Sequence, residues 1–386
     1  MNTNRRHDID ALRALAFALV ILYHVAMYYV AGWHWHIKSP HAAEWLQWPM
    51  RALNLWRMDL VFLVSGVALA FLRRGQGGAG LFGRRSLRLL LPLAVGMLVV
   101  VPYQPYAQAV ANGVVEPGFG AFLARYFTGG PWPRDAFDGA DPGVTWNHLW
   151  YLPYLWLYTA VLLALLPVVE RGRPFFTGLR GAAMALVPVL PLALASAVLL
   201  PRFMPTHDLL HDAWVHAISF TLFCYGYWLG GDADGWWAEA ARLRRRHAAA
   251  AAVLLVLLFT LPLPRASLRA LADAYLWTTI LAVLGYAHQH LNRPWPWLAW
   301  ANEQVYPWYV LHQTLIIWLA VQLAALRLGP VAEPLLLVAG TAAGCWAATA
   351  LIRRSNALRP LFGLKPRVRA RCPAPATPAH PAARSA

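Results

Sequence analysis

Long apolar runs separated by short polar segments repeat along the whole chain. Ten of these runs reach or approach the roughly 20 residues that an α-helix needs to cross a bilayer. They cover residues 11–31, 57–72, 88–104, 148–169, 181–200, 213–231, 247–262, 270–288, 304–324 and 333–352. The runs at 57–72 and 247–262 are short, which fits tilted or half-buried helices. The pattern predicts an all-α, polytopic integral membrane protein of about ten transmembrane helices.

The composition supports a membrane protein and argues against a nucleic-acid partner. Of the 386 residues, 59% are hydrophobic and 13% are charged, whereas a soluble domain has about 45–50% apolar and 25% charged residues. The net charge of +16 would indicate nucleic-acid binding in a soluble protein. Here the basic residues form short clusters between apolar runs, as in the cytoplasmic loops of membrane proteins. We therefore expect membrane lipids, and no nucleic acid, as partners.

The basic residues also predict the orientation. With a cytoplasmic N-terminus, 24 of the 33 Lys and Arg residues fall on the inner side, and ten spans return the C-terminus to the cytoplasm. The first run is not a cleaved signal peptide, because it is too long and contains Arg13. We expect a single transmembrane domain over residues 1–354, with a long outer loop at 105–147. A basic, disordered cytoplasmic tail is expected over 355–386.

Cysteine and histidine spacing gives no metal site. Cys224, Cys345 and Cys372 lack partners at metal or redox spacing. The WHWH tract containing His34 and His36 has no further ligand set around it. No metal and no disulfide are therefore expected.

The first run contains two polar residues on one helical face. Arg13 and His24 are eleven residues apart, which returns to within about 20° of the same direction and rises about 16 Å. A fixed cation and a titratable base along one stripe suit a long anionic ligand. The alternative is a snorkelling arginine and a histidine that packs against a neighbouring helix.

Two arginines stand where the third run begins. Arg85 and Arg88 are three residues apart and share a helical face. Near a helix N-terminus, two guanidinium groups are suited to bind phosphate. Without further context, charge that merely fixes the topology is the simpler interpretation.

The ninth run carries a second histidine at a depth similar to that of His24. His312 lies about 12 Å from the inner edge, so the two histidines from distant runs are placed to converge on one site. A structural contact between His312 and Gln313 is the alternative.

Several polar residues lie toward the predicted outer side. Asp59 lies near the outer end of the second run, and Gly66 near its middle permits close helix approach. His148 and Trp150 begin the fourth run. Tryptophans of the outer segments fit either an interfacial belt or stacking on sugar rings.

Four of these segments together resemble the motifs of the membrane acyltransferase-3 family. They are IDALR followed by Arg-x10-His in the first run, MDLVFLVSG at 58–66, RSLRLLLP at 85–92 and VYPWYVLHQ at 305–313. The matches occur in the family's order and extend over residues 8–320. The opening RRHDIDALRALA and the segment HLWYL at 148–152 are most similar to the glucan biosynthesis protein C group, which is implicated in adding succinyl groups to periplasmic glucans.

The resemblance implies a role for each matching residue. Arg13, Arg85 and Arg88 would hold an acyl-CoA donor, succinyl-CoA or acetyl-CoA, from the cytoplasmic side. His24 would be the catalytic base or acyl carrier, with catalytic roles also for His312 and for Asp10, which would orient Arg13.

The acceptor and the location also follow from the resemblance. A hydroxyl of an extracytoplasmic glycan, such as periplasmic glucan, would approach past Asp59, His148 and Trp150. The expected location is the bacterial inner membrane, with glucan-synthesis machinery as a possible partner.

Two other functions are compatible with the residues. One is a transporter or flippase for an anionic solute or acyl donor, although the chain shows no internal repeat of the transporter kind. The other is a non-catalytic scaffold in envelope assembly. The two predict, respectively, substrate movement without a covalent product and no biochemical effect of removing His24 or His312.

Overall fold

The structure is a computed structural model that describes residues 6–74, 76–231 and 233–367. These residues form helices and no strands. The α-helices are α1 (His7–Tyr29), α2 (Gln47–Asn54), α3 (Arg57–Arg73), α4 (Gly78–Val95), α5 (Tyr103–Ala111), α6 (Phe119–Phe127), α7 (Tyr151–Ala164), α8 (Leu166–Gly178), α9 (Gly181–Leu186), α10 (Val189–Leu199), α11 (Ala213–Leu229), α12 (Asp234–Thr260), α13 (Arg265–Leu291), α14 (Pro296–Ala324), α15 (Ala332–Arg354) and α16 (Leu358–Leu361). Two short 3₁₀ helices, η1 (Glu44–Leu46) and η3 (Asn147–Trp150), and a π-helical turn, η2 (Gly96–Val100), complete the list. The all-helical prediction is confirmed.

Each predicted apolar run lies on one to three consecutive helical segments. Within the described residues, six helical segments are long and apolar enough to cross a membrane, and the bent pair α7–α8 makes a seventh. The helices α11, α12 and α14 are not among them. The first has 17 residues, the second has three consecutive arginines beside its apolar half, and the third carries buried polar side chains. The count of about ten crossings stays a prediction.

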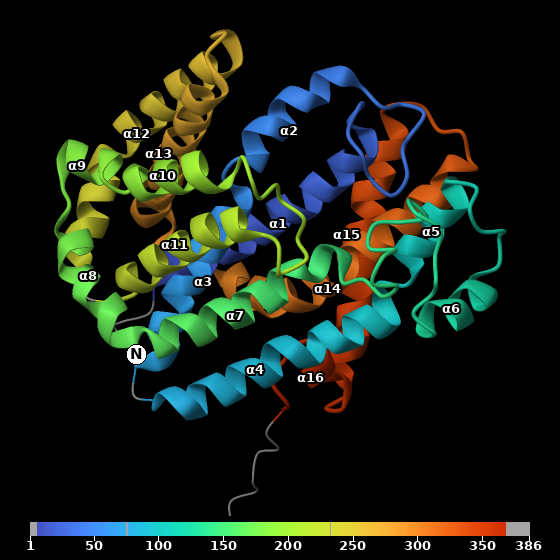
Figure 1. Ribbon diagram of the computed structural model, residues 1–386. Coiled ribbons are helices and arrows are strands. Elements are labelled where there is room, and N and C mark those ends of the chain that lie inside the picture. Colours follow the sequence, from blue (N-terminus) through green and yellow to red (C-terminus); the bar gives the residue numbers. More distant parts are fainter. Residues whose placement is uncertain (1–5, 75, 232, 368–386) are drawn as a thin grey trace, which may run out of the picture.

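The helix α1 lies in the interior of the bundle (Figure 1). It contacts α3, α13, α14 and α15, so residues from many parts of the chain surround it. One large core cluster joins side chains of α1, α3, α4, α7, α11, α13 and α14. Polar groups on α1 therefore meet partners that are far away in the sequence.

Glycines allow α3 and α11 to pack at backbone contact. A Cβ atom at Gly66 would overlap the carbonyl oxygen of Phe223, and one at Gly226 would overlap that of Leu63. Such close approach is typical of small residues at membrane helix interfaces. The role predicted for Gly66 is confirmed.

Two breaks shape the helices near the site. The axes of α7 and α8 differ by 91°, and the bend is at Leu165. The helix α4 contains Pro92 and is followed by the π-helical turn. Proline removes the helical hydrogen bond to the carbonyl oxygen four residues before it, and the π-helical turn changes the winding further along the same segment.

The predicted outer loop at 105–147 contains helical structure. The helices α5 and α6 pack around a small aromatic cluster that includes Phe122, Tyr126 and Phe137. Phe122 and Tyr126 are four residues apart on α6, so both face the same side. This region lies at the opposite end of the molecule from α8 and α9 (Figure 1).

The first part of the predicted disordered tail is folded. Arg359 on α16 is only 8% exposed and donates to Glu303 on α14 at 3.2 Å. Arg353 pairs with the same carboxylate at 3.0 Å. The prediction of disorder was wrong for residues 355–367, because it missed the ion pairs with Glu303; the remainder of the tail, 368–386, lies outside the described residues.

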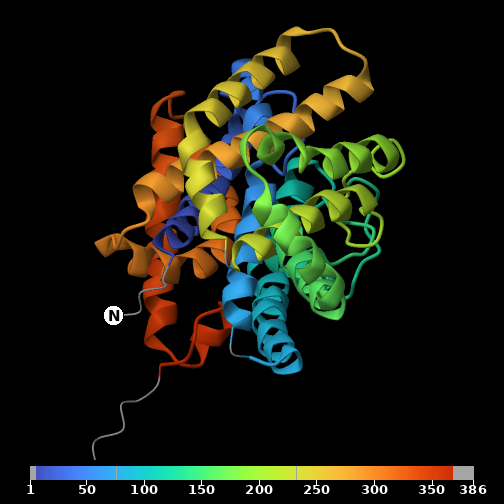
Figure 2. The same cartoon turned by 90° about the vertical axis from the view of Figure 1, so that its left-hand side faces the viewer.

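The helices α12 and α13 form a hairpin whose tip projects from the bundle (Figure 2). Trp48 on α2 packs against Phe259 near this tip, with ring centroids 5.1 Å apart. The base of the hairpin contacts α1 through α13. The space between hairpin and bundle therefore lies beside α1.

Candidate functional site

The structure brings His24 of α1 and His312 of α14 into direct contact. Nδ1 of His24 lies 2.8 Å from Nε2 of His312, and the rings are stacked with centroids 5.0 Å apart. His312 is fully buried, whereas His24 is partly exposed. The predicted convergence of the two histidines is thus what the structure shows.

The hydrogen bonds around His312 determine which nitrogens carry protons. Nδ1 of His312 lies 3.0 Å from the carbonyl oxygen of Trp308 and 2.8 Å from that of Tyr309. A carbonyl oxygen only accepts, so this Nδ1 carries the proton, and Nε2 of neutral His312 is an acceptor. His24 must then donate from its Nδ1. The Nε2 atom of His24 is left with a lone pair, as a general base requires.

His148 belongs to the same cluster, contrary to its predicted place at the outer edge. Its ring is 5.0 Å from that of His312, edge to face. Nε2 of His148 donates to the carbonyl oxygens of Tyr309 and Val310 at 3.2 Å, and Nδ1 accepts from Gln104 at 3.2 Å. Both ring nitrogens are occupied, so His148 holds η3 against α14 rather than offering a free group to a substrate.

A chain of buried amides links this cluster to the segment after α1. Nε2 of Gln313 donates to Gln104 at 2.9 Å and to His36 at 3.1 Å. His36 in turn donates from Nδ1 to Gln108 at 2.7 Å. The suggested contact between His312 and Gln313 does not form, because Gln313 faces this chain instead.

The outer end of the chain is an acidic side chain. His34 lies 2.9 Å from Asp138, and His36 lies 3.9 Å from the same carboxylate. Burial raises the pKa of Asp138, but the charge of His36 and contacts with His34 and Gln108 outweigh burial and hold this pKa below its usual value. Burial lowers the pKa of His36, and the charge of Asp138 opposes this effect.

The arginines predicted to bind a donor lie near the other end of α1. Arg13 donates from Nε to Asn302 of α14 at 2.8 Å and pairs with Asp10 at 3.8 Å. Arg85 of α4 donates to Thr159 of α7 at 2.8 Å. The charges of Arg13 and Arg85 both act on Tyr151, so helices α1 and α4 present these cations to one region.

Arg88 lies beside them and is exposed. Its charge and that of Arg85 act on Tyr306 of α14. The hydroxyl of Tyr306 donates to the carbonyl oxygen of Arg88 at 2.9 Å, which fixes α4 against α14. Spacing alone left these arginines open to a purely topological interpretation; their grouping with Arg13 depends on the tertiary structure.

Aromatic side chains fill the distance between the cations and the histidines. Phe17 of α1 lies 5.5 Å from Tyr309 and 6.2 Å from Tyr151, between ring centroids. The ring of Tyr309 is 6.1 Å from that of His312. Tyr151 also forms a short hydrogen bond with Ser65. Tyr151 lies in the HLWYL segment and Tyr309 in the VYPWYVLHQ segment, but neither motif predicted a role for its tyrosine.

Comparison with known proteins fits this arrangement. Residues 6–352 match the acyltransferase domain of the acyltransferase-3 family. The chain belongs to the acyltransferase-3 family. No curated protein and no solved structure matches it significantly. The apolar helices and the family together make it a membrane acyltransferase.

In this acyltransferase, Asp10 is far from the histidine pair. It is fourteen residues before His24 on the same helix, a rise of about 21 Å. Asp10 therefore contacts Arg13 and does not touch the atoms that His24 reaches. Its predicted role in orienting Arg13 fits the geometry, whereas a direct catalytic role does not.

Asp59 contacts α11, and Trp150 contacts the segment that precedes α11. Asp59 accepts from Ser219 of α11 at 3.1 Å. Trp150 packs on the ring of His207, with centroids 4.2 Å apart, and Trp146 donates to the carbonyl oxygen of His207 at 2.9 Å. The segment before α11 therefore covers this part of the acyltransferase, which sequence reasoning did not anticipate.

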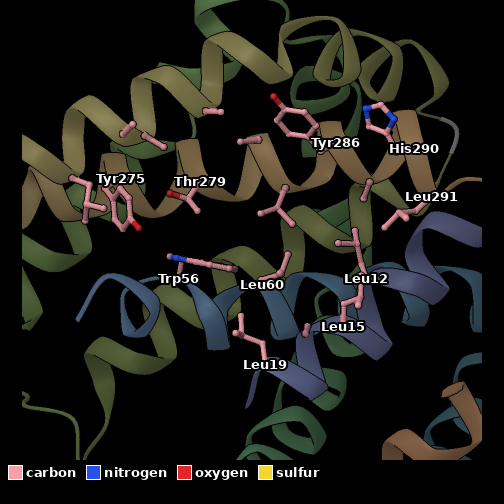
Figure 3. Close-up of a pocket in the computed structure, with 18 residues that line it drawn as sticks. Leu12, Leu15, Leu19, Trp56, Leu60, Tyr275, Thr279, Tyr286, His290 and Leu291 are labelled. Atoms are coloured by element: carbon pink, nitrogen blue, oxygen red, sulfur yellow. The ribbon is translucent and has the colours of Figure 1, made fainter. Parts of the chain in front are cut away.

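A cavity of about 620 Å³ lies beside α1 but not at the histidine pair. Figure 3 shows Leu12, Leu15 and Leu19 of α1 on one side and Tyr275 and Tyr286 of α13 on the other. The residues lining it include no arginine, lysine or carboxylate. Such a lining suits hydrocarbon chains and not the phosphates of a nucleotide.

A second group of cations was not predicted to form a site, because in the sequence these residues look like charges that only fix the topology. Arg73, Arg74 and Arg173 line a small cavity of about 100 Å³ at the end of α3. Glu170 pairs with Arg73 at 3.0 Å and with Arg173 at 2.9 Å. One carboxylate among three cations leaves the group with net positive charge.

Proposed function

We propose that the protein is an integral-membrane O-acyltransferase. It transfers a succinyl or acetyl group from cytoplasmic acyl-CoA to a hydroxyl of an extracytoplasmic glycan, such as periplasmic glucan. The observation that carries this proposal is the His24–His312 pair, in which His24 retains an unprotonated Nε2. The family supports acyl transfer; the donor and the acceptor are part of the proposal.

The cationic region supports a nucleotide donor. Arg13, Arg85 and the exposed Arg88 are the cations that we assign to the phosphates, and guanidinium forks suit phosphate groups. The rise of about 16 Å from Arg13 to His24 is a distance that the extended arm of CoA can cover. A thioester would then lie near His24 while the phosphates stay with the arginines.

The proposed step balances atoms and charge. Nε2 of His24 takes the proton of the acceptor hydroxyl as its oxygen attacks the thioester carbonyl carbon. The new C–O ester bond forms and the C–S bond breaks. The protonated His24 then gives its proton to the sulfur of CoA. His312 orients His24 throughout by accepting from Nδ1, in the manner in which a third group orients a catalytic base.

The proposed topology places this step across the membrane. We propose about ten crossings in the bacterial inner membrane, both termini in the cytoplasm, and a possible association with glucan-synthesis machinery. The excess of basic residues on one side supports this orientation. The histidine pair then joins a cytoplasmic donor to an outer acceptor.

Mass spectrometry of periplasmic glucans and other extracytoplasmic glycans tests the proposal. Four strains are compared: wild type, a deletion, and deletions complemented with His24→Ala or His290→Ala. His290 is exposed on α13 and serves as the matched control. Ester additions are expected in wild type and His290→Ala only, and their mass identifies the acyl group.

Two results would count against the proposal. Ester additions retained in His24→Ala would remove His24 as the catalytic base. Identical glycan spectra in all strains, together with acyl-CoA or solute movement across proteoliposomes without an ester product, would favour the transporter or flippase.

A further inference from the structure

Arg57 is a buried cation at the first position of α3. It is 5% exposed. The face of its guanidinium group stacks on the ring of Tyr23 of α1, with Cζ 3.4 Å from the ring centroid. This cation–π contact partly offsets the cost of burying the charge.

Two of these donors have no partner. Nε and Nη1 of Arg57 are buried without a hydrogen bond to any of the described residues. Asp59, two residues further along α3, accepts from Ser219 instead. A buried charge is costly unless its hydrogen bonds are satisfied. An arginine used only to fix the topology would extend to the surface.

The position of Arg57 relates it to the proposed reaction centre. The centroid of the Tyr23 ring lies 6.1 Å from that of the His24 ring. Because Cζ of Arg57 lies 3.4 Å from the same Tyr23 centroid, Cζ and the His24 ring are separated by at most the sum of these two distances. The charge of Arg57 acts on both His24 and His207.

We propose that Arg57 binds a carboxylate at the far end of the acyl group, so that the donor is a dicarboxylic acyl thioester such as succinyl-CoA. This inference rests on the proposed function and narrows its donor. A group of this kind carries its carboxylate two methylenes beyond the carbonyl carbon. With the thioester at His24, the carboxylate reaches toward Arg57, where it accepts from the free donors. Acetyl-CoA has no group for this site.

The inference explains why a poorly satisfied cation is retained inside the bundle. A site built to pair with a charged group rejects an analogue that lacks it, because its own buried groups then stay unpaired. Arg57 would therefore select the donor by discrimination against uncharged acyl chains. Donors of equal length with and without the carboxylate should differ in affinity.

Binding of three donors to the full-length protein tests this directly. Succinyl-CoA, butyryl-CoA and acetyl-CoA are titrated calorimetrically into wild type, Arg57→Gln, Arg57→Met and Arg51→Gln. Butyryl-CoA has the chain length of succinyl-CoA without its carboxylate. Arg51 is exposed on α2 and contacts Gln47, so its variant is the matched control.

Wild type and Arg51→Gln are expected to bind succinyl-CoA roughly 100-fold more tightly than butyryl-CoA. Both Arg57 variants should lose this preference and keep their affinity for butyryl-CoA. Their thermal midpoints should equal or exceed that of wild type, because an unpaired buried charge has been removed. This stability readout separates a binding role from a structural one.

Each other outcome overturns the inference in a distinguishable way. Equal affinity of wild type for succinyl-CoA and butyryl-CoA refutes the donor assignment but leaves the acyltransferase proposal intact. Unchanged donor preference in Arg57→Gln, with loss of transfer only to anionic glycans, assigns the anion to the acceptor instead. If wild type binds none of the three donors and forms no ester, both the proposed function and the inference fail.

Discussion

Replacing His312 by leucine tests the assignment of protons in the histidine pair. In the wild type, Nδ1 of His24 donates to Nε2 of His312 at 2.8 Å. Leucine fills a similar space but accepts no hydrogen bond. The Nδ1–H group of His24 then loses its partner, and the ring is free to place its proton on Nε2. A ring in that tautomer has no lone pair facing the acceptor hydroxyl.

The structure sets the scale of the effect. A hydrogen bond of this kind contributes about 0.5–1.5 kcal/mol net, which corresponds to a shift of up to roughly tenfold in the population of the active tautomer. Loss of ring orientation adds to this. Complete loss of a general base costs about 100- to 10,000-fold, which is the limit set by His24→Ala. His312→Leu should therefore lower kcat by at least about twofold, without exceeding that limit.

A second variant separates hydrogen bonding from packing. His312→Gln keeps an acceptor oxygen near His24 and should recover part of the activity that His312→Leu loses. Turnover of radiolabelled acyl-CoA in nanodiscs measures both. The double variant His24→Ala/His312→Leu should be no slower than His24→Ala, because the two residues act as a unit. Wild-type kcat in His312→Leu, or strictly additive losses in the double variant, would refute the reasoning.

Three further predictions concern stability and local folding. Gly226→Ala should destabilise the protein by more than the roughly 1–3 kcal/mol of ordinary overpacking, because the added Cβ atom would overlap the backbone of α3. Gly178→Ala is the control and should not destabilise the protein, because the space around Gly178 is open. Thermal melts of both variants measure the difference. Asp138→Asn should lower stability at pH 7 by less than about 1 kcal/mol. Since the folded state lowers the pKa of Asp138, this stabilisation is present above the unfolded pKa of about 3.9 and is lost as the pH falls through the folded value, so the difference in Tm from wild type should shrink toward pH 3. Glu303→Gln should release residues 355–367, detected as faster limited proteolysis there; unchanged cleavage would show that other contacts hold this segment.

The sequence by itself determined the class of fold and part of the site. Apolar runs are local patterns, and each one is helical in the structure. Arg13 and His24 share a face because helical geometry fixes the angle between them. Burying a charged or titratable group in an apolar run costs free energy, so the sequence alone indicated that His24, His312 and Arg85 are candidate functional residues. It did not indicate their partners. The predicted boundary of the tail was wrong where the local pattern was weak, as at the buried Arg359, whose partner Glu303 belongs to another helix.

Only the tertiary structure decided how these groups work together. The contact between His24 and His312 joins residues 288 positions apart, and carbonyl oxygens of α14 fix which nitrogen is the base. Spacing placed His148 at an edge, whereas packing buried it beside His312. No sequence pattern indicated that Arg57 is buried. Its burial against Tyr23 depends on how α1 and α3 pack, because hydrogen-bond partners and burial are properties of the assembled bundle and not of any single helix.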